Sequence, residues 1–115
     1  MDANDQVITD MQKTDAGAYV ALTGDIDLSR SPTLRYGLLQ LVQGKPKRLI
    51  VDLAGVPYMD SSGVATLVEA LQQQRRAGGR MILCGLQPKV RSIFEIARLD
   101  MVFTIVEDKD KAMQA

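Results

Sequence analysis

Apolar and polar positions alternate along this chain in short runs that predict strands separated by helices. Two extended segments near the N-terminus flank the sequence Thr14-Asp15-Ala16-Gly17, whose residue types favour a turn, so we predict a β-hairpin. Three later runs are apolar without helical spacing, as is typical of strands covered on both faces. The predicted strands cover residues 6–13, 18–23, 48–53, 81–84 and 102–106.

The first predicted helix follows residue 30. Ser31 is expected to cap its N-terminus, and Pro32 suits the first helical position because its fixed φ is already helical. The glycine and proline of segment 44–46 are expected to end it. Its apolar face is expected to carry Leu34, Leu38 and Leu41.

The second predicted helix has the clearest pattern in the chain. Asp60 precedes it as the expected N-cap, and Gly78-Gly79 is expected to form a left-handed C-terminal cap. Arg75 and Arg76 in its last turn complement the helix dipole. Its apolar face is expected to carry Val64, Leu67, Val68 and Leu71.

A third helix is expected to begin at Pro88, and residues 108–115 predict a short terminal helix that is acidic at its start. The order of elements is then β-β-α-β-α-β-α-β-α, in which helices between strands require right-handed crossovers. We therefore predict one α/β domain over residues 1–115, with an N-terminal hairpin and a mixed, mainly parallel sheet of four to five strands covered by helices. The apolar face of the third helix is expected to carry Val90, Ile93, Phe94 and Ala97.

The composition excludes several classes of protein. The chain has 115 residues with 14 basic and 14 acidic side chains, and it contains no histidine. Because an imidazole titrates near neutral pH and ligates zinc, its absence excludes Ser-His-Asp hydrolases, histidine phosphocarriers and the commoner zinc sites. The sequence also lacks a Cys-x-x-Cys pair, a phosphate-binding Gly-x-x-x-x-Gly-Lys-Ser/Thr loop and a dinucleotide glycine fingerprint. We predict no catalytic residue, no cofactor and no metal site.

The net charge of zero argues against nucleic acid as a direct partner, because phosphate backbones are bound by an excess of Lys and Arg. No apolar run approaches the ~20 residues of a membrane span, and residues 1–6 lack a signal-peptide pattern. The lone Cys84 lies in an apolar run, which indicates a small buried side chain and a reducing compartment. We expect a cytoplasmic protein with no nucleic-acid partner and no membrane partner.

Functional groups of open α/β sheets gather where strand C-termini lead into helix N-termini. In one such loop Asp60, as N-cap, places Ser61 in the first helical turn with its hydroxyl toward solvent. A phosphate on Ser61 would meet free N–H groups at the positive end of the helix dipole. Gly63, which has no side chain, allows another backbone to approach closely. The loops in question are 24–31, 53–63 and 85–88.

Each of these features also has a simpler explanation. Segment 60–63 can be a helix cap and nothing more, since such caps are common. Asp25 and Asp27 can be helix-entry acids or solvated turn residues. The residues taken singly leave these alternatives open, and only their joint occurrence along one α/β unit favours a functional site.

The joint pattern consists of three motifs. Segment 22–27 has the form Leu-x-Gly-x-x-Asp, segment 60–63 reads Asp-Ser-Ser-Gly at the start of the second helix, and Gly78-Gly79 follows that helix. With these motifs the chain resembles the anti-sigma factor antagonist family, the stand-alone form of the STAS domain, from about residue 6 to residue 106. The joint match is more specific than any one motif.

The resemblance implies a phosphorylation switch in bacterial signalling that controls sigma-factor-dependent transcription. Ser61, directly after Asp60, is the implied phosphorylation site, and Ser62 is the second choice. The implied partners are an anti-sigma factor that is also a serine kinase, bound only by the unphosphorylated protein, and a serine phosphatase that resets the switch. A flush surface that includes Val56 and Pro57 is expected to dock the kinase. The implied partner-binding residues are Asp25, Asp27, Leu28, Tyr58, Met59, Asp60, Ser61, Ser62 and Gly63.

Other functions fit part of the pattern. A STAS-like subunit that binds the ATPase of a lipid-transport or sensory complex has the same fold, and neighbouring genes would separate the two readings. A phospho-aspartate receiver would use acids at strand ends such as Asp25, Asp27 and Asp52, but the run 102–106 offers no lysine to pair an acyl phosphate. A small enzyme would have only Asp and Ser for catalysis. The sequence leaves the oligomeric state open.

Overall fold

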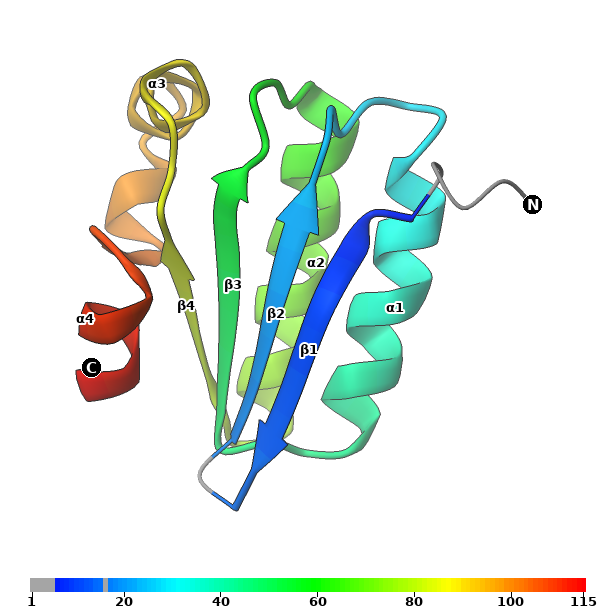
Figure 1. Ribbon diagram of the computed structural model, residues 1–115, viewed down its shortest axis with the longest axis vertical. Coiled ribbons are helices and arrows are strands. Elements are labelled where there is room, and N and C mark those ends of the chain that lie inside the picture. The colour runs from blue at the N-terminus through cyan, green and yellow to red at the C-terminus, as the bar shows by residue number, and fades with distance from the viewer. Residues whose placement is uncertain (1–5, 16) are drawn as a thin grey trace.

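A five-stranded sheet forms the centre of the protein in the computed structural model, which describes residues 6–15 and 17–115 (Figure 1). The strands lie in the order β1-β2-β3-β4-β5. β1 runs antiparallel to β2, and every other neighbouring pair is parallel, so the predicted hairpin and the mixed, mainly parallel sheet are confirmed. The strands are β1 (Ile8–Thr14), β2 (Gly17–Thr23), β3 (Arg48–Gly55), β4 (Arg80–Cys84) and β5 (Thr104–Val106).

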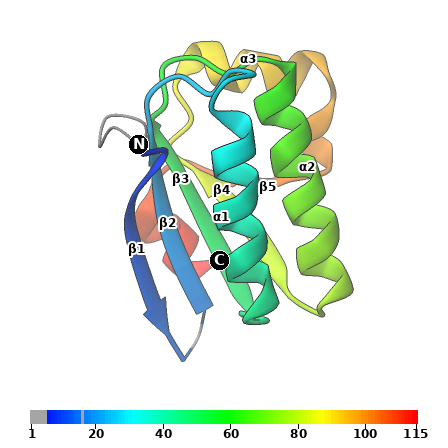
Figure 2. The same cartoon turned by 90° about the vertical axis from the view of Figure 1, so that its right-hand side faces the viewer.

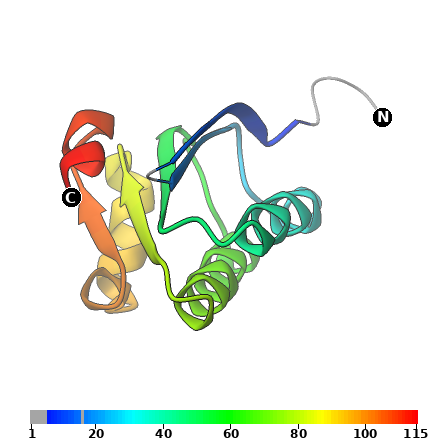
Figure 3. The same cartoon turned by 90° about the horizontal axis from the view of Figure 1, so that it is seen from below.

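The helices cover the sheet unequally. α1 and α2 pack side by side on one face (Figure 2), and α4 lies on the other face against β3, β4 and β5 (Figure 3). Among the described residues no helix is both long and apolar enough to cross a membrane. The helices are α1 (Ser31–Gln43), α2 (Ser61–Arg76), α3 (Pro88–Ile96), the short 3-10 helix η2 (Leu99–Met101) and α4 (Lys109–Gln114).

The main core lies between the sheet and helices α1, α2 and α3, and it is almost entirely aliphatic. Phe94 of α3 and Phe103 are its aromatic pair, with ring centroids 5.5 Å apart in an edge-to-face arrangement. A smaller cluster under α4 contains Cys84, and burial raises the pKa of this thiol to about 12. The expectation of a small buried side chain at Cys84 is therefore confirmed.

The start of α1 differs from the prediction. Ser31 is the first helical residue and is buried, and the N-cap position belongs to Arg30, which makes no capping hydrogen bond. The preceding turn is organised by Asp27, whose backbone carbonyl accepts the Ser31 N–H at 2.8 Å. The prediction of Ser31 as the cap is wrong because Asp27, four residues earlier, already closes this turn.

The C-terminal elements are shorter than predicted. Residues 99–101 form η2, so the last strand begins at Thr104 and not at residue 102. Of the predicted apolar face of α3, Val90 and Phe94 are buried, whereas Ala97 follows the helix and is exposed. The acidic start of the terminal helix is confirmed, since the Asp108 carboxylate accepts the Lys111 N–H at 2.9 Å.

Candidate functional site

Two loops meet at the carboxyl ends of the parallel strands, as expected for an open α/β sheet. Ile26 forms an isolated parallel bridge with Met59. The Ile26 N–H donates to the Tyr58 carbonyl at 2.9 Å, and the Asp60 N–H donates to the Ile26 carbonyl at 3.0 Å. The bridge fixes the loop before α1 against the loop before α2, so the first and second predicted motifs form one surface.

Gly63 allows this close approach, as the sequence predicts. A Cβ atom at Gly63 would lie 2.7 Å from a side-chain carbon of Ile26, 2.7 Å from one of Met59, and 3.2 Å from the Ile26 carbonyl oxygen. Ile26 and Met59 are both buried, so neither can move aside without disturbing the core. The glycine therefore sets how closely the first turn of α2 packs on the neighbouring loop.

Asp60 caps α2 with its side chain, which confirms the prediction. Its Oδ1 accepts the Ser62 hydroxyl at 2.5 Å, the Ser62 N–H at 2.9 Å and the Gly63 N–H at 3.3 Å. The pKa of this carboxyl lies below its usual range despite partial desolvation. The main cause is the hydrogen bond from the Ser62 hydroxyl, and backbone N–H groups, those of Gly63, Ser62 and Leu28, add to it.

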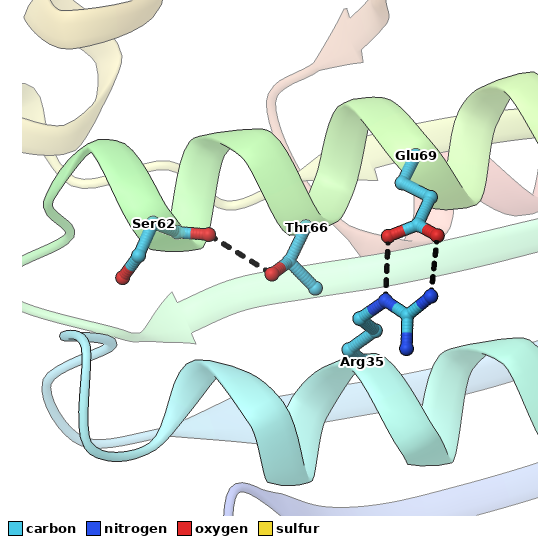
Figure 4. A network of polar contacts seen from close by, with 4 residues as sticks. All are labelled: Arg35, Ser62, Thr66 and Glu69. Carbon is cyan, nitrogen blue, oxygen red and sulfur yellow. Dashed lines mark hydrogen bonds and ion pairs between the residues drawn. The ribbon is translucent and has the colours of Figure 1, made fainter.

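The two candidate serines differ in their surroundings. The Ser61 side chain is exposed in the first turn of α2, and no hydrogen bond involves its hydroxyl within the described part of the chain. The Ser62 hydroxyl is half-buried and donates to Asp60, while the Ser62 carbonyl accepts the Thr66 hydroxyl at 2.9 Å (Figure 4). Ser61 is thus the serine that a second protein can reach without breaking an existing contact.

The two acids of the first motif are not equivalent. Asp27 Oδ1 accepts the Ser29 hydroxyl at 2.7 Å and the Ser29 and Arg30 N–H groups, and the Ser29 hydroxyl is the main cause of its lowered pKa. The negative charge of Asp60 acts against this lowering. Asp25 is exposed, and its carboxylate has no hydrogen bond among the described residues. Within that part of the chain no cluster of acids and cysteine suits a metal ion.

Arg30 is a structural residue of the site that the sequence interpretation missed. Its guanidinium donates to three backbone carbonyls, those of Asp25 at 2.5 Å, Gln6 at 2.9 Å and Thr23 at 3.0 Å. These bonds tie the first motif to the start of β1. No local pattern predicts them, because the carbonyls come from segments up to 24 residues away.

The surface around Ser61 is apolar but differs in part from the predicted one. Leu28 and Tyr58 are 75% and 50% exposed, whereas Val56 and Met59 are buried. The expectation that Val56 forms this surface is wrong, because its side chain points into the main core. Met59 is also buried in that core, and it contributes only as a lining residue of the hollow beside Ser61. A shallow apolar hollow beside Ser61 extends instead onto α3. It is lined by Tyr58, Met59, Asp60, Ser61, Val64, Ala65, Ile93 and Ala97.

The two helices behind this surface are joined by an ion pair. The Arg35 guanidinium of α1 donates two hydrogen bonds to the Glu69 carboxylate of α2, at 2.7 and 2.8 Å (Figure 4). Such a two-point contact fixes orientation as well as distance. Both partners are partly exposed, so we assign the pair to helix alignment and not to a large share of stability.

Asp60→Ala is expected to lower the melting temperature at pH 7 by roughly 4–8 °C, the effect of a lost N-cap. Asp60→Asn, which keeps a capping oxygen, is the control and is expected to lower the melting temperature much less. The pKa of Asp60 is lower in the folded protein than in the unfolded chain, where it is near 4. The stability that the ionised Asp60 contributes is therefore fully present above about pH 4 and is lost as the pH falls through the folded-state pKa. The measurement is thermal unfolding of wild type, Asp60→Ala and Asp60→Asn from pH 7 to pH 3. An equal fall in melting temperature at pH 7 for the two variants would contradict the capping role.

Comparisons with known proteins agree with this geometry. The STAS domain model matches residues 8–112. The anti-sigma-B factor antagonist of Bacillus subtilis is 28% identical over 106 residues, which cover 91% of this chain and 95% of that protein. The anti-sigma-B factor antagonist of Listeria monocytogenes is 31% identical over 88 residues, which cover 75% of this chain and 75% of that protein. The crystal structure of an anti-sigma factor antagonist from Mycobacterium paratuberculosis superposes with a TM-score of 0.86 at 24% identity, covering 99% of this chain and 97% of that one. The chain therefore belongs to the STAS domain family, among the anti-sigma factor antagonists.

Proposed function

We propose that this protein binds an anti-sigma serine kinase and is switched off when that kinase phosphorylates Ser61. The carrying observation is the contrast between the two serines: the Ser61 hydroxyl is exposed and unengaged among the described residues, whereas the Ser62 hydroxyl donates to Asp60 at 2.5 Å. The unphosphorylated protein would bind the kinase, and the kinase would then release its sigma factor.

The chemistry of the switch belongs to the kinase. The Ser61 oxygen would attack the γ-phosphorus of ATP bound to the kinase, its proton would pass to a kinase base, and ADP would leave. This chain contributes a hydroxyl held on a rigid helix end. A serine phosphatase would restore the hydroxyl by hydrolysis. The proposed setting is the bacterial cytoplasm, where ATP and the sigma factor are found.

Related structures support a switch of this kind. SpoIIAA, an anti-sigma factor antagonist of Bacillus, has been solved in unphosphorylated and phosphorylated forms, with TM-scores of 0.69 and 0.71 against this chain at 20% and 21% identity. The first turn of α2 here offers an exposed serine at the positive end of the helix dipole. The expectation of free N–H groups beside Ser61 is wrong for Ser62 and Gly63, because their N–H groups already donate to the Asp60 carboxylate. We therefore transfer the phosphorylation, but not a particular kinase, to this protein.

The kinase is proposed to dock on the apolar surface around Ser61. Exposed Leu28 and Tyr58 flank the serine, and the hollow lined by Ala65 and Ile93 continues from it. A protein that covers Ser61 also covers this hollow, because Ser61 lies on its rim. Asp25, Asp27 and Asp60 supply the polar part of the same surface.

The test is phosphate transfer with the kinase recovered from source cells by the immobilised protein. Wild type incubated with kinase and ATP is expected to gain one phosphate by intact-mass spectrometry. Ser62→Ala is expected to gain the same phosphate, and Ser61→Ala none. A Ser61→Ala protein phosphorylated to the wild-type level would overturn the assignment.

A further inference from the structure

The neutral chain gathers many of its cations at one end. The parallel strands begin there, opposite the Ser61 site, and β1 ends at the same end (Figure 1). We call this cluster the basic end. It consists of Lys13, Lys45, Lys47, Arg48, Arg75, Arg76 and Arg80.

Several contacts bring these residues together from four segments of the chain. Arg48 and Arg80 are register partners at the starts of β3 and β4. Lys45 and Arg76 line one recess between α1 and α2, and Arg75 and Arg80 line another. Lys13 lines a third recess with Gly44 and Pro46. The sequence separates these cations, whereas the fold makes them neighbours.

Most of this charge is uncompensated. Lys13, Lys45, Lys47, Arg76 and Arg80 are exposed and form no ion pair or side-chain hydrogen bond within residues 6–15 and 17–115. Arg75 donates to the Val102 carbonyl, which leaves its positive charge in place. Arg48 donates to the Met113 carbonyl and to an oxygen of Ala115, so it is not counted as uncompensated. Two acids lie near these cations: Asp15 follows β1, and Glu69 lines the recess of Lys45 and Arg76 but is paired with Arg35. Cations near the ends of α1 and α2 partly offset the helix dipoles, but Lys13 and Arg80 lie outside these helices.

We propose that the basic end binds an anionic membrane surface, which departs from the expectation of no membrane partner drawn from the sequence alone. Clusters of four to eight Lys and Arg are attracted to anionic lipid without a defined pocket, at about fivefold in affinity for each cation. The basic end suits binding to a lipid surface because its long cationic side chains are mostly exposed and come from four segments of the chain, not from one pocket. Single-stranded nucleic acid is disfavoured because no aromatic side chain lines the three recesses described above, so bases would have no ring to stack on there.

Binding to a membrane by the basic end would leave the proposed phosphorylation site, Ser61, accessible. Arg76 ends α2 and Ser61 begins it, and a helix of 16 residues is about 24 Å long. A molecule held by its basic end would present Ser61 away from the lipid. The membrane proposal does not depend on phosphorylation and would stand if Ser61 were never modified.

The test is co-sedimentation of the full chain with vesicles of phosphatidylcholine alone and vesicles containing about 30% phosphatidylserine. Wild type is expected to bind only the anionic vesicles, and to lose at least about tenfold in affinity between about 50 and 300 mM salt. The triple variant Lys45→Gln, Lys47→Gln, Arg76→Gln is expected to bind at least about tenfold more weakly. Its circular dichroism and melting curve check that it folds.

The control removes the same charge from the other end of the molecule. Lys89→Gln, Arg91→Gln, Arg98→Gln, in and after α3, is expected to bind within about twofold of wild type. Equal losses in both triple variants would show a net-charge effect and overturn the proposal. No binding of wild type above the phosphatidylcholine level would overturn it as well, and so would tighter binding to a mixed-sequence DNA duplex at the same salt.

Discussion

Gly63→Ala is expected to destabilise the protein by about 1–3 kcal/mol, although alanine is the better helix former. The new methyl group would lie 2.7 Å from carbons of Ile26 and Met59, and the Ile26 carbonyl oxygen limits any shift of the helix. The two side chains are buried and cannot swing into solvent. Denaturant unfolding measures the change, with the midpoint falling and the slope unchanged if the fold is kept.

Gly37→Ala is the matched control, because it makes the same substitution inside α1. There the added Cβ meets only the terminal methyl group of Ile8, which can rotate away. The control is expected to be neutral or more stable by up to about 1 kcal/mol, since glycine is costly inside a helix. Equal destabilisation by both substitutions would contradict the role assigned to Gly63 in packing the two loops.

Local patterns predicted the elements of this fold well. The strands read as apolar runs, and α2 was marked by its apolar spacing, by Asp60 at its start and by glycine after its end. Gly78 does adopt a left-handed φ of 85°, as a helix-ending glycine is expected to. These features depend on residues within one or two turns of each other, which is the range that sequence patterns report. Ser31 failed as a cap because Asp27, a turn residue with its own side-chain bonds, took over the same function.

Features that depend on distant segments were missed. Met59 is next to the predicted cap, yet its side chain is buried because the Ile26 bridge turns the loop inward. The contribution of α3 to the hollow beside Ser61 comes from Ile93 and Ala97, which are more than 30 residues from Ser61. The zero net charge concealed the basic end for the same reason, since a sum over the chain carries no information about placement.

Phosphorylation of Ser61 is expected to weaken kinase binding about 100-fold, which corresponds to about 2.7 kcal/mol. A phosphate adds a charge of about −1.5 to −2 on the rim of an apolar hollow. In the complex that charge would lose water and stand beside Asp60, with Asp27 near it, and all three groups are negative. In the free protein the same repulsion is screened by water, and the N-terminus of α2 favours the negative charge of the phosphate there.

The most direct measurement is the dissociation constant of the kinase for purified unmodified protein and for protein fully phosphorylated by that kinase. Binding is measured without ATP, so that no phosphate is added during the titration, and Ser61→Ala passed through the same kinase treatment is the control. We expect tight binding of unmodified protein and of treated Ser61→Ala, and about 100-fold weaker binding of the phosphorylated form. Equal affinities of the unmodified and phosphorylated proteins would contradict the proposed switch.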